Sequence, residues 1–223
     1  MDVSTAVQQR ISTRAFLDTP LPKSDVEAWL QDAQRSPSGG NVQPWRVIAV
    51  SGEARNEIVE LAMKTLMSNP GGEPTDRPIY PEGLAPIYME RRRAVAHQMY
   101  DKVGIARDDK GARMAWMAKN FTFFDAQVGL FFVLEESMGH GQWAHTGMFM
   151  QTLALLAEER GWATCMQECW AMLRPSLKAH FGLAENEMLY CGMAVGYADK
   201  TAPVNSLHAD RAPLEEFADL RGF

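Results

Sequence analysis

The segment of residues 142–160 constrains the fold most, because it has the length of a helix and almost no polar face. Its central stretch, TGMFMQTLALLA, contains only three clearly polar residues, Thr146, Gln151 and Thr152. Gly161 follows directly and is a residue type that ends helices in a left-handed conformation. A helix that is apolar nearly all round must be buried on most sides. The sequence therefore predicts a long helix at the centre of a domain or in a subunit interface.

Short apolar runs elsewhere predict the strands that surround this helix. They are bounded by polar or helical segments and occupy residues 45–50, 126–134, 162–167 and 188–197. Helical spacing of apolar residues predicts further helices at 2–9, 24–36, 53–67, 88–100, 108–120 and 175–181. For the second of these, Ser24 and Glu27 predict a capping box. Because the strands are scattered singly between helices, we expect an α+β architecture with a small central sheet.

The chain is expected to form a single domain over residues 1–223. Its composition, with 46% hydrophobic and 22% charged residues, is that of an ordinary globular domain with one core. Residues 68–86 are dense in proline and glycine, and we interpret them as a surface excursion rather than a domain boundary. With the helical segments that follow, this excursion covers about residues 68–117.

The charge, the apolar runs and the cysteines of the sequence argue against several classes of protein. The formal net charge of −6 argues against a nucleic-acid-binding or anionic-membrane surface. No apolar run reaches the length of a membrane span, and the first residues lack the apolar core of a signal peptide. The three cysteines are an odd number in such a chain, which favours reduced thiols in the cytoplasm. They have no metal-ligand spacing, so we expect no metal site.

Two polar segments are candidates for ligand binding. In an extended segment Arg10, Ser12 and Arg14 project to the same side, where two guanidinium groups and a hydroxyl match a phosphate monoester. The second segment, SPSGGNVQPW at residues 36–45, combines two glycines and two prolines with small hydrogen-bonding side chains. It is either a rigid ligand-binding loop or a plain connection into the strand that follows. Common catalytic motifs such as GxSxG, the P-loop and HExxH are absent.

The combination of these segments resembles the FMN-dependent nitroreductases over essentially the whole chain. The resemblance rests on RISTRAF (10–16), RSPSGGNVQPWRVIAV (35–50), NFTFFDAQVGLFFV (120–133), GQWAHTGMFMQTLALLAEERGWATCMQE (141–168) and CGMAVGYADKTAPVNSLHADRAP (191–213). It implies a nitroreductase-like α+β fold in which helices surround a mainly antiparallel sheet. It also implies a homodimer with an FMN site at the subunit interface.

The resemblance assigns cofactor-binding roles by position. Arg10, Ser12, Arg14 and Arg211 match the residues that bind the FMN phosphate and ribityl chain. Pro37, Ser38, Gly39 and Asn41 match a loop that the other subunit contributes to the flavin ring. Asn120 matches a position that hydrogen-bonds the pyrimidine side of the ring. Gln167 and Glu168 match a turn whose backbone amides contact flavin N5 and O4. Two positions depart from the family pattern: His208 stands where related sequences often have arginine, and His145 stands where they often have aspartate.

The activity that this resemblance implies is NAD(P)H-dependent reduction of nitroaromatic compounds by ping-pong hydride transfer. The flavin carries the chemistry, so no catalytic side chain is expected. NADH and NADPH both remain open as donors. The alternatives are another flavin reaction on the same scaffold, such as quinone or enone reduction, reductive dehalogenation or flavin fragmentation, and a flavin-binding protein without catalysis.

Overall fold

The computed structural model describes residues 1–75 and 77–223. In these residues the helices and strands predicted from the sequence form in the predicted order. The helices are α1 (Val3–Gln9), α2 (Lys23–Ala33), α3 (Gly52–Ser68), α4 (Pro86–Lys102), α5 (Lys110–Ala118), α6 (His140–Glu159) and α7 (Arg174–His180). The strands are β1 (Arg46–Ser51), β2 (Val128–Glu135), β3 (Ala163–Gln167) and β4 (Glu187–Gly196). Short 3₁₀ turns join them: η1 (Gly39–Asn41), η2 (Lys119–Asp125), η3 (Glu168–Leu173), η4 (Pro203–Ser206) and η5 (Leu214–Glu216).

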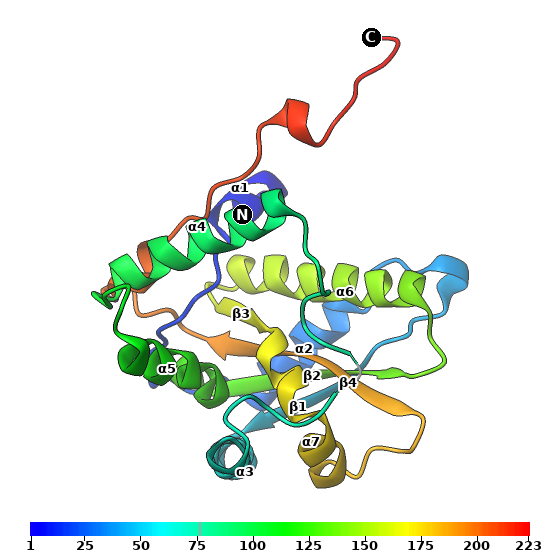
Figure 1. Ribbon diagram of the computed structural model, residues 1–223. Helices are drawn as coiled ribbons and strands as arrows, with labels where there is room; N and C mark the ends of the chain where they lie inside the picture. The colour runs from blue at the N-terminus through cyan, green and yellow to red at the C-terminus, as the bar shows by residue number, and fades with distance from the viewer. Residues whose placement is uncertain (76) are drawn as a thin grey trace.

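The four strands form one sheet in the order β1-β2-β4-β3, and every neighbouring pair is antiparallel (Figure 1). The two central strands, β2 and β4, are almost completely buried, as their continuous apolar sequences require. A register shift between Phe132 and Val133 bends their pairing. The expected α+β architecture with a small antiparallel sheet is confirmed.

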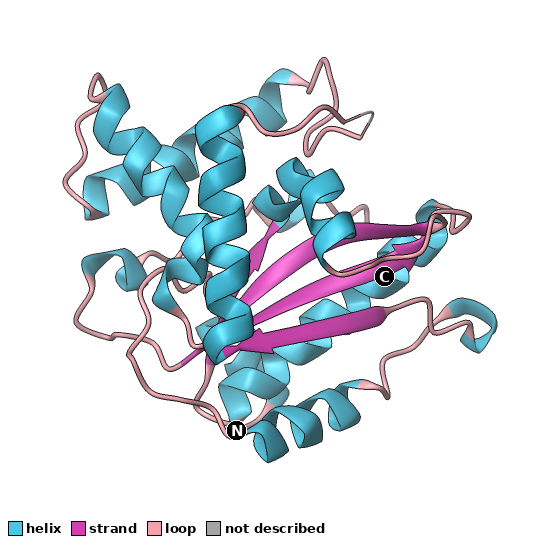
Figure 2. Cartoon of the chain, turned by 90° about the horizontal axis from the view of Figure 1, so that it is seen from below, coloured by secondary structure: helices cyan, strands magenta, loops and turns pink. Residues whose placement is uncertain are grey.

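Helices cover both faces of the sheet, so the protein has two cores (Figure 2). Along β2, Leu130 and Phe132 face the core formed with α2 and α6, whereas Phe131 faces the core formed with α3, α7, η2 and η3. This alternation follows from the two-residue period of a strand.

Helix α6 is the predicted core helix. Phe149, Met150 and Leu153 are buried on its inner side, and the Trp29 indole of α2 donates to the Leu153 carbonyl oxygen at 3.0 Å. The helix ends as predicted, with Gly161 at φ +70° and the Trp162 N–H donating to the Ala157 carbonyl oxygen at 2.9 Å. One apolar face of α6 is not covered within this chain, since the Met148 side chain is 44% exposed.

Two glycines of the central strands allow aromatic rings to lie directly on the sheet. A Cβ atom at Gly129 would stand 2.3 Å from the Phe123 ring, and a Cβ atom at Gly192 would stand 2.2 Å from the Trp170 ring. The two rings also pack on each other, with centroids 4.6 Å apart. The backbone reaches this arrangement through a left-handed stretch at Phe123, Phe124 and Asp125. These contacts fix η2 and η3 against the sheet.

The predicted capping box of α2 does not form. The Pro22 carbonyl oxygen accepts from the N–H groups of Asp25 and Val26, so the helix begins at Lys23 and includes Ser24 in its first turn. The Ser24 hydroxyl donates instead to the Asp25 carboxylate at 3.2 Å.

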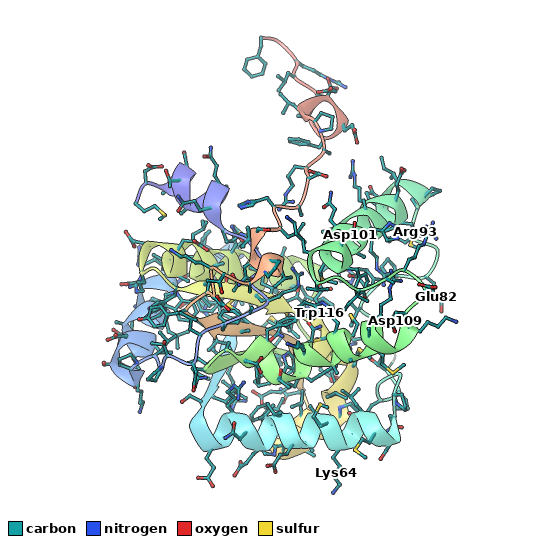
Figure 3. The ribbon with its side chains drawn as sticks, turned by 90° about the vertical axis from the view of Figure 1, so that its left-hand side faces the viewer. Lys64, Glu82, Arg93, Asp101, Asp109 and Trp116 are labelled. Carbon is teal, nitrogen blue, oxygen red and sulfur yellow. The ribbon has the colours of Figure 1, made fainter. Side chains whose placement is uncertain are left out.

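The excursion of residues 68–117 contains α4 and α5, apart from residue 76, which lies outside the described residues. Neither helix buries a residue completely. The C-terminal tail extends away from the body on the side of α1 and α4, opposite α3, whose Lys64 points outward (Figure 3). None of the described helices has the length and apolar character that a bilayer span requires.

Candidate functional site

The RISTR segment lies against β3, which orients its side chains. The Thr13 N–H donates to the Thr164 carbonyl oxygen at 3.0 Å, and Phe16 forms an isolated antiparallel bridge with Ala198. Thr13 is 1% exposed and faces inward. Because side chains alternate along an extended segment, its neighbours Ser12 and Arg14 face the other way.

A cavity of about 410 Å³ lies on this outer side of the segment. It brings together, from the two ends of the chain, the four residues that sequence similarity assigns to the FMN phosphate and ribityl chain, together with the histidine that stands where related sequences often have arginine. These are Arg10, Ser12, Arg14, His208 and Arg211. Apolar side chains, including Val95 of α4, complete the walls.

The arginines of this cavity keep their positive charge available for an anion. The Arg14 guanidinium donates to the Ser12 carbonyl oxygen at 3.2 Å, and the Arg211 guanidinium donates to the Ala209 carbonyl oxygen at 2.7 Å. Across residues 1–75 and 77–223, no carboxylate lies within 4.0 Å of Arg10, Arg14 or Arg211. A phosphate is the kind of anion that such guanidinium groups bind well.

These arginines affect the pKa values of two titratable groups, one on α6 and one on β3. Burial raises the pKa of the Glu158 carboxyl on α6, an effect that nearby Arg10 opposes. Burial likewise raises the pKa of the Cys165 thiol on β3, and both Arg14 and Arg10 oppose that shift. The charge of Arg10 therefore affects a group on α6, and the charges of Arg14 and Arg10 affect a group on β3.

The other end of β3 holds a buried polar network. The Gln167 side chain is buried, and its amide nitrogen donates to the Asn120 carbonyl oxygen at 2.7 Å. Its amide oxygen accepts from the Trp170 indole N–H at 3.1 Å. The Asn120 side chain donates to the Met117 carbonyl oxygen at 3.0 Å. Asn120 and Gln167, predicted to border one ring, are therefore direct neighbours.

Glu168 follows at the start of η3 and is an exposed residue that is desolvated in part. Desolvation raises the pKa of the Glu168 carboxyl. It also raises the pKa of the neighbouring Cys191 thiol to about 12. The three cysteines are buried free thiols, as predicted. No cluster of His, Cys, Asp or Glu in the described part of the chain is arranged to hold a metal ion.

The spacing between the cationic cavity and the polar network of Gln167 fits an elongated ligand with an anionic end. Thr164, which contacts the RISTR segment, and Gln167 are three residues apart on β3, or roughly 10 Å along a strand. A phosphate in the cationic cavity and a polar ring near Gln167 would therefore lie along one side of β3. The residues present fit FMN in charge and in layout.

The loop that contains Pro37, Ser38, Gly39 and Asn41 lies elsewhere. Its Gly39 N–H contacts His145 Nε2 at 3.4 Å, near the start of α6, whereas Arg10 lies close enough to Glu158, near the end of α6, to affect its pKa. Thirteen residues separate His145 from Glu158, which is roughly 20 Å along a helix. Within one chain the loop and the cationic cavity are therefore separate.

The loop has an irregular backbone with several left-handed residues. Of the two glycines, only Gly40 has a positive φ, +59°. Asn41 and Gln43 also adopt left-handed conformations, and the Ser38 hydroxyl oxygen accepts from the Gln43 N–H at 2.9 Å. A Cβ atom at Gly39 would stand 3.1 Å from the His145 ring, so a larger residue there would require the imidazole to shift slightly.

Sequence reasoning did not identify Val95 and Asn205 as site residues. Val95 lies on α4, which carries no motif, and it reaches the cavity only through the tertiary fold. Asn205 contacts Arg14, from which it is 191 residues distant in sequence. A single sequence carries no signal for such a pairing.

Comparisons with known proteins show the family of the chain. The family model "Nitroreductase family" matches residues 7–197. The nitrobenzene nitroreductase of Ectopseudomonas oleovorans is 34% identical over 96% of this chain and 95% of its own length. The crystal structure of the FMN and NADPH-dependent nitroreductase NfnB from Sphigopyxis sp. strain HMH covers 100% of both chains, with a TM-score of 0.96 and 40% identity. The FMN-dependent nitroreductase NfnB from Mycobacterium smegmatis, solved in complex with NADPH, covers 98% of this chain and 99% of its own, with a TM-score of 0.90 and 29% identity. The chain belongs to the nitroreductase family.

Proposed function

We propose that this protein is an FMN-dependent NAD(P)H oxidoreductase that reduces nitroaromatic compounds by a ping-pong mechanism. The observation that carries this proposal is the cationic cavity at one end of β3, in a chain that matches nitroreductases over their whole length. The named relatives act on nitrobenzene, chloronitrobenzene and 4-nitrobenzoate, so a small nitroaromatic ring is the substrate class.

The residues of the cavity bind the phosphate end of FMN in this proposal. Arg10, Arg14 and Arg211 supply charge-assisted hydrogen bonds, and Ser12 supplies a hydroxyl between the two arginines of its segment. His208 adds a donor and, when protonated, a further charge.

Near the ring, the chain orients the flavin and does not donate a catalytic side chain. When bound, FMN supplies the redox chemistry, accepting hydride from NAD(P)H and reducing the nitro group after the nicotinamide has left. The Gln167 and Glu168 amides orient the reactive edge, and Asn120 borders the pyrimidine side. Since the Gln167 side chain is occupied by Asn120 and Trp170, we assign this role to the backbone of the residue.

A second copy of the chain completes the site in this proposal. The loop of Pro37, Ser38, Gly39 and Asn41 lies roughly 20 Å along α6 from the cavity. In this proposal it therefore does not contact the flavin whose phosphate lies in the cavity of the same chain. A homodimer in which the α6 helices pack antiparallel brings the loop of one protomer to the cavity of its partner. The exposed Met148 of α6 and the exposed Leu214, Phe217, Leu220 and Phe223 of the tail are the apolar surface that such a dimer needs to cover.

The proposed location is the cytoplasm. The three buried free thiols are compatible with a reducing compartment, where NADH and NADPH are also available.

The experiment that tests this function is an anaerobic titration of the purified protein. We expect a flavin absorption band that bleaches on addition of NADH or NADPH and returns on addition of nitrobenzene, with hydroxylaminobenzene as product. A band that bleaches but does not return with nitroaromatics, and returns with a quinone, an enone or a haloarene, would assign another flavin reaction. Bound FMN that no nicotinamide reduces would indicate a flavin-binding protein without catalysis.

A further inference from the structure

We infer that Asn205 is a positioning residue for the phosphate end of the FMN site and that it acts through the backbone of Arg14. This inference rests on the proposed function, in which the cationic cavity holds the FMN phosphate. Asn205 does not line the cavity itself. Its role follows from the segments that it joins.

The Asn205 side chain ties three separate segments together. Its amide oxygen accepts from the Arg14 backbone N–H at 2.8 Å. Its amide nitrogen donates to the Ala15 carbonyl oxygen at 2.8 Å and to the Asp199 carbonyl oxygen at 2.9 Å. Both N–H donors of the amide are thereby used, and no smaller side chain offers one acceptor and two donors in one plane.

These bonds add to the attachment of the RISTR segment, where the Asp199 N–H also donates to the Ala15 carbonyl oxygen at 3.0 Å. The Thr13 N–H is held by Thr164, and the Leu17 N–H is held by the Tyr197 carbonyl oxygen at 2.8 Å. Between these two points, the Asn205 oxygen is the acceptor that the described residues provide for the Arg14 N–H. Removal of the Asn205 side chain leaves the Arg14 N–H without this acceptor.

The same contact sets the distance between the two walls of the cavity. Arg14 belongs to the N-terminal wall, while His208 and Arg211 follow Asn205 by three and six residues in the C-terminal wall. Asn205 is held in η4, where its own N–H donates to the Ala202 carbonyl oxygen at 3.0 Å and its neighbour Val204 is buried. The geometry therefore couples both walls through one amide. A site binds an anion more tightly when its charged groups are already held in place before the anion binds.

The test compares FMN with riboflavin, which is the same molecule without its phosphate. Dissociation constants of both are measured by flavin fluorescence quenching on apoprotein of the wild type, Asn205→Ala and the matched control Ser206→Ala. Ser206 is adjacent and makes only a local bond to the Pro203 carbonyl oxygen at 2.8 Å. We expect Asn205→Ala to bind FMN about tenfold more weakly and riboflavin with unchanged affinity, and Ser206→Ala to match the wild type.

A double variant separates positioning from general structural damage. In an Arg14→Ala background, Asn205→Ala should weaken FMN binding less than about twofold further, because the guanidinium that the anchored backbone positions is gone. If Asn205→Ala does not yield folded protein, Asn205→Ser serves in both comparisons. Equal weakening of FMN and riboflavin, or full additivity with Arg14→Ala, overturns the inference. A wild-type protein that binds riboflavin as tightly as FMN instead overturns the proposed phosphate site, and with it this inference.

Discussion

The Gln167 side-chain amide donates to the Asn120 carbonyl oxygen at 2.7 Å and so joins the end of β3 to η2. The same amide accepts from the Trp170 indole, so one buried side chain holds two turns that border the proposed flavin ring. This bond also explains why a glutamine is buried at 1% exposure in an apolar core.

We therefore expect Gln167→Met, a change of similar size, to destabilise the apoprotein. The Asn120 carbonyl and the Trp170 N–H would lose their partners in the interior, which lowers the free energy of unfolding by about 2–4 kcal/mol. Urea denaturation measures the change, and Gln31→Met, at an exposed position of α2, is the control. Equal stability of the two variants would mean that the network contributes little.

Two substitutions on α6 distinguish the fold from the dimer. Leu153→Glu places a carboxylate at a position with 0% exposure inside the chain, and we expect it to prevent folding. Met148→Glu places the same group on the exposed face, so the monomer should fold with a native circular dichroism spectrum. Sedimentation velocity should then find a monomer that retains FMN poorly, because the loop of the partner is missing. A dimeric Met148→Glu protein with full flavin content contradicts the proposed use of this face.

The sequence predicted the elements well because their signals are local. The apolar run of α6, the glycine at its end and the β-branched runs of the strands each depend on neighbours within one or two turns. Ser24 was wrongly assigned as an N-cap because Pro22, two residues earlier, is already the N-cap of the helix. The alternation in RISTR predicted a phosphate site, but only the resemblance to a family added Arg211 to it, since nothing in RISTR indicates contact with His208 or Arg211. The hydrogen bonds of Asn205 and the left-handed turn at Phe123 depend on packing between distant segments. Such packing cannot be deduced from a single sequence.

Arg14→Ala tests the cavity directly. A guanidinium contact to phosphate contributes about 1.5–3 kcal/mol, so FMN affinity should fall about tenfold to hundredfold. Equilibrium dialysis of the apoprotein against FMN measures this change. Arg35→Ala removes an exposed arginine that does not line the cavity and should leave the affinity unchanged. Unchanged affinity in Arg14→Ala would remove this residue from the phosphate site.

His208→Arg should strengthen FMN binding. The position lines the cavity, and arginine carries a permanent charge and a planar set of donors that matches a phosphate. Because the side chain is exposed, screening limits the gain to about twofold to fivefold. The gain should shrink when the titration is repeated in high salt. Weaker binding at both salt concentrations would indicate that the histidine makes a specific contact that arginine cannot replace.

Glu168 gives the apoprotein a predictable pH dependence. Its pKa is raised in the folded state by desolvation, so folding takes up a proton between the unfolded and the folded pKa. Stability from this group is fully present below the unfolded value near 4.5 and is lost as the pH rises through the folded pKa. Glu168→Gln should therefore raise the melting temperature of the apoprotein at pH 7 and leave it nearly unchanged at pH 4, while Glu60→Gln, on the exposed side of α3, should change neither value. A stabilisation of Glu168→Gln that is equal at both pH values would mean that removal of the charge is not its cause.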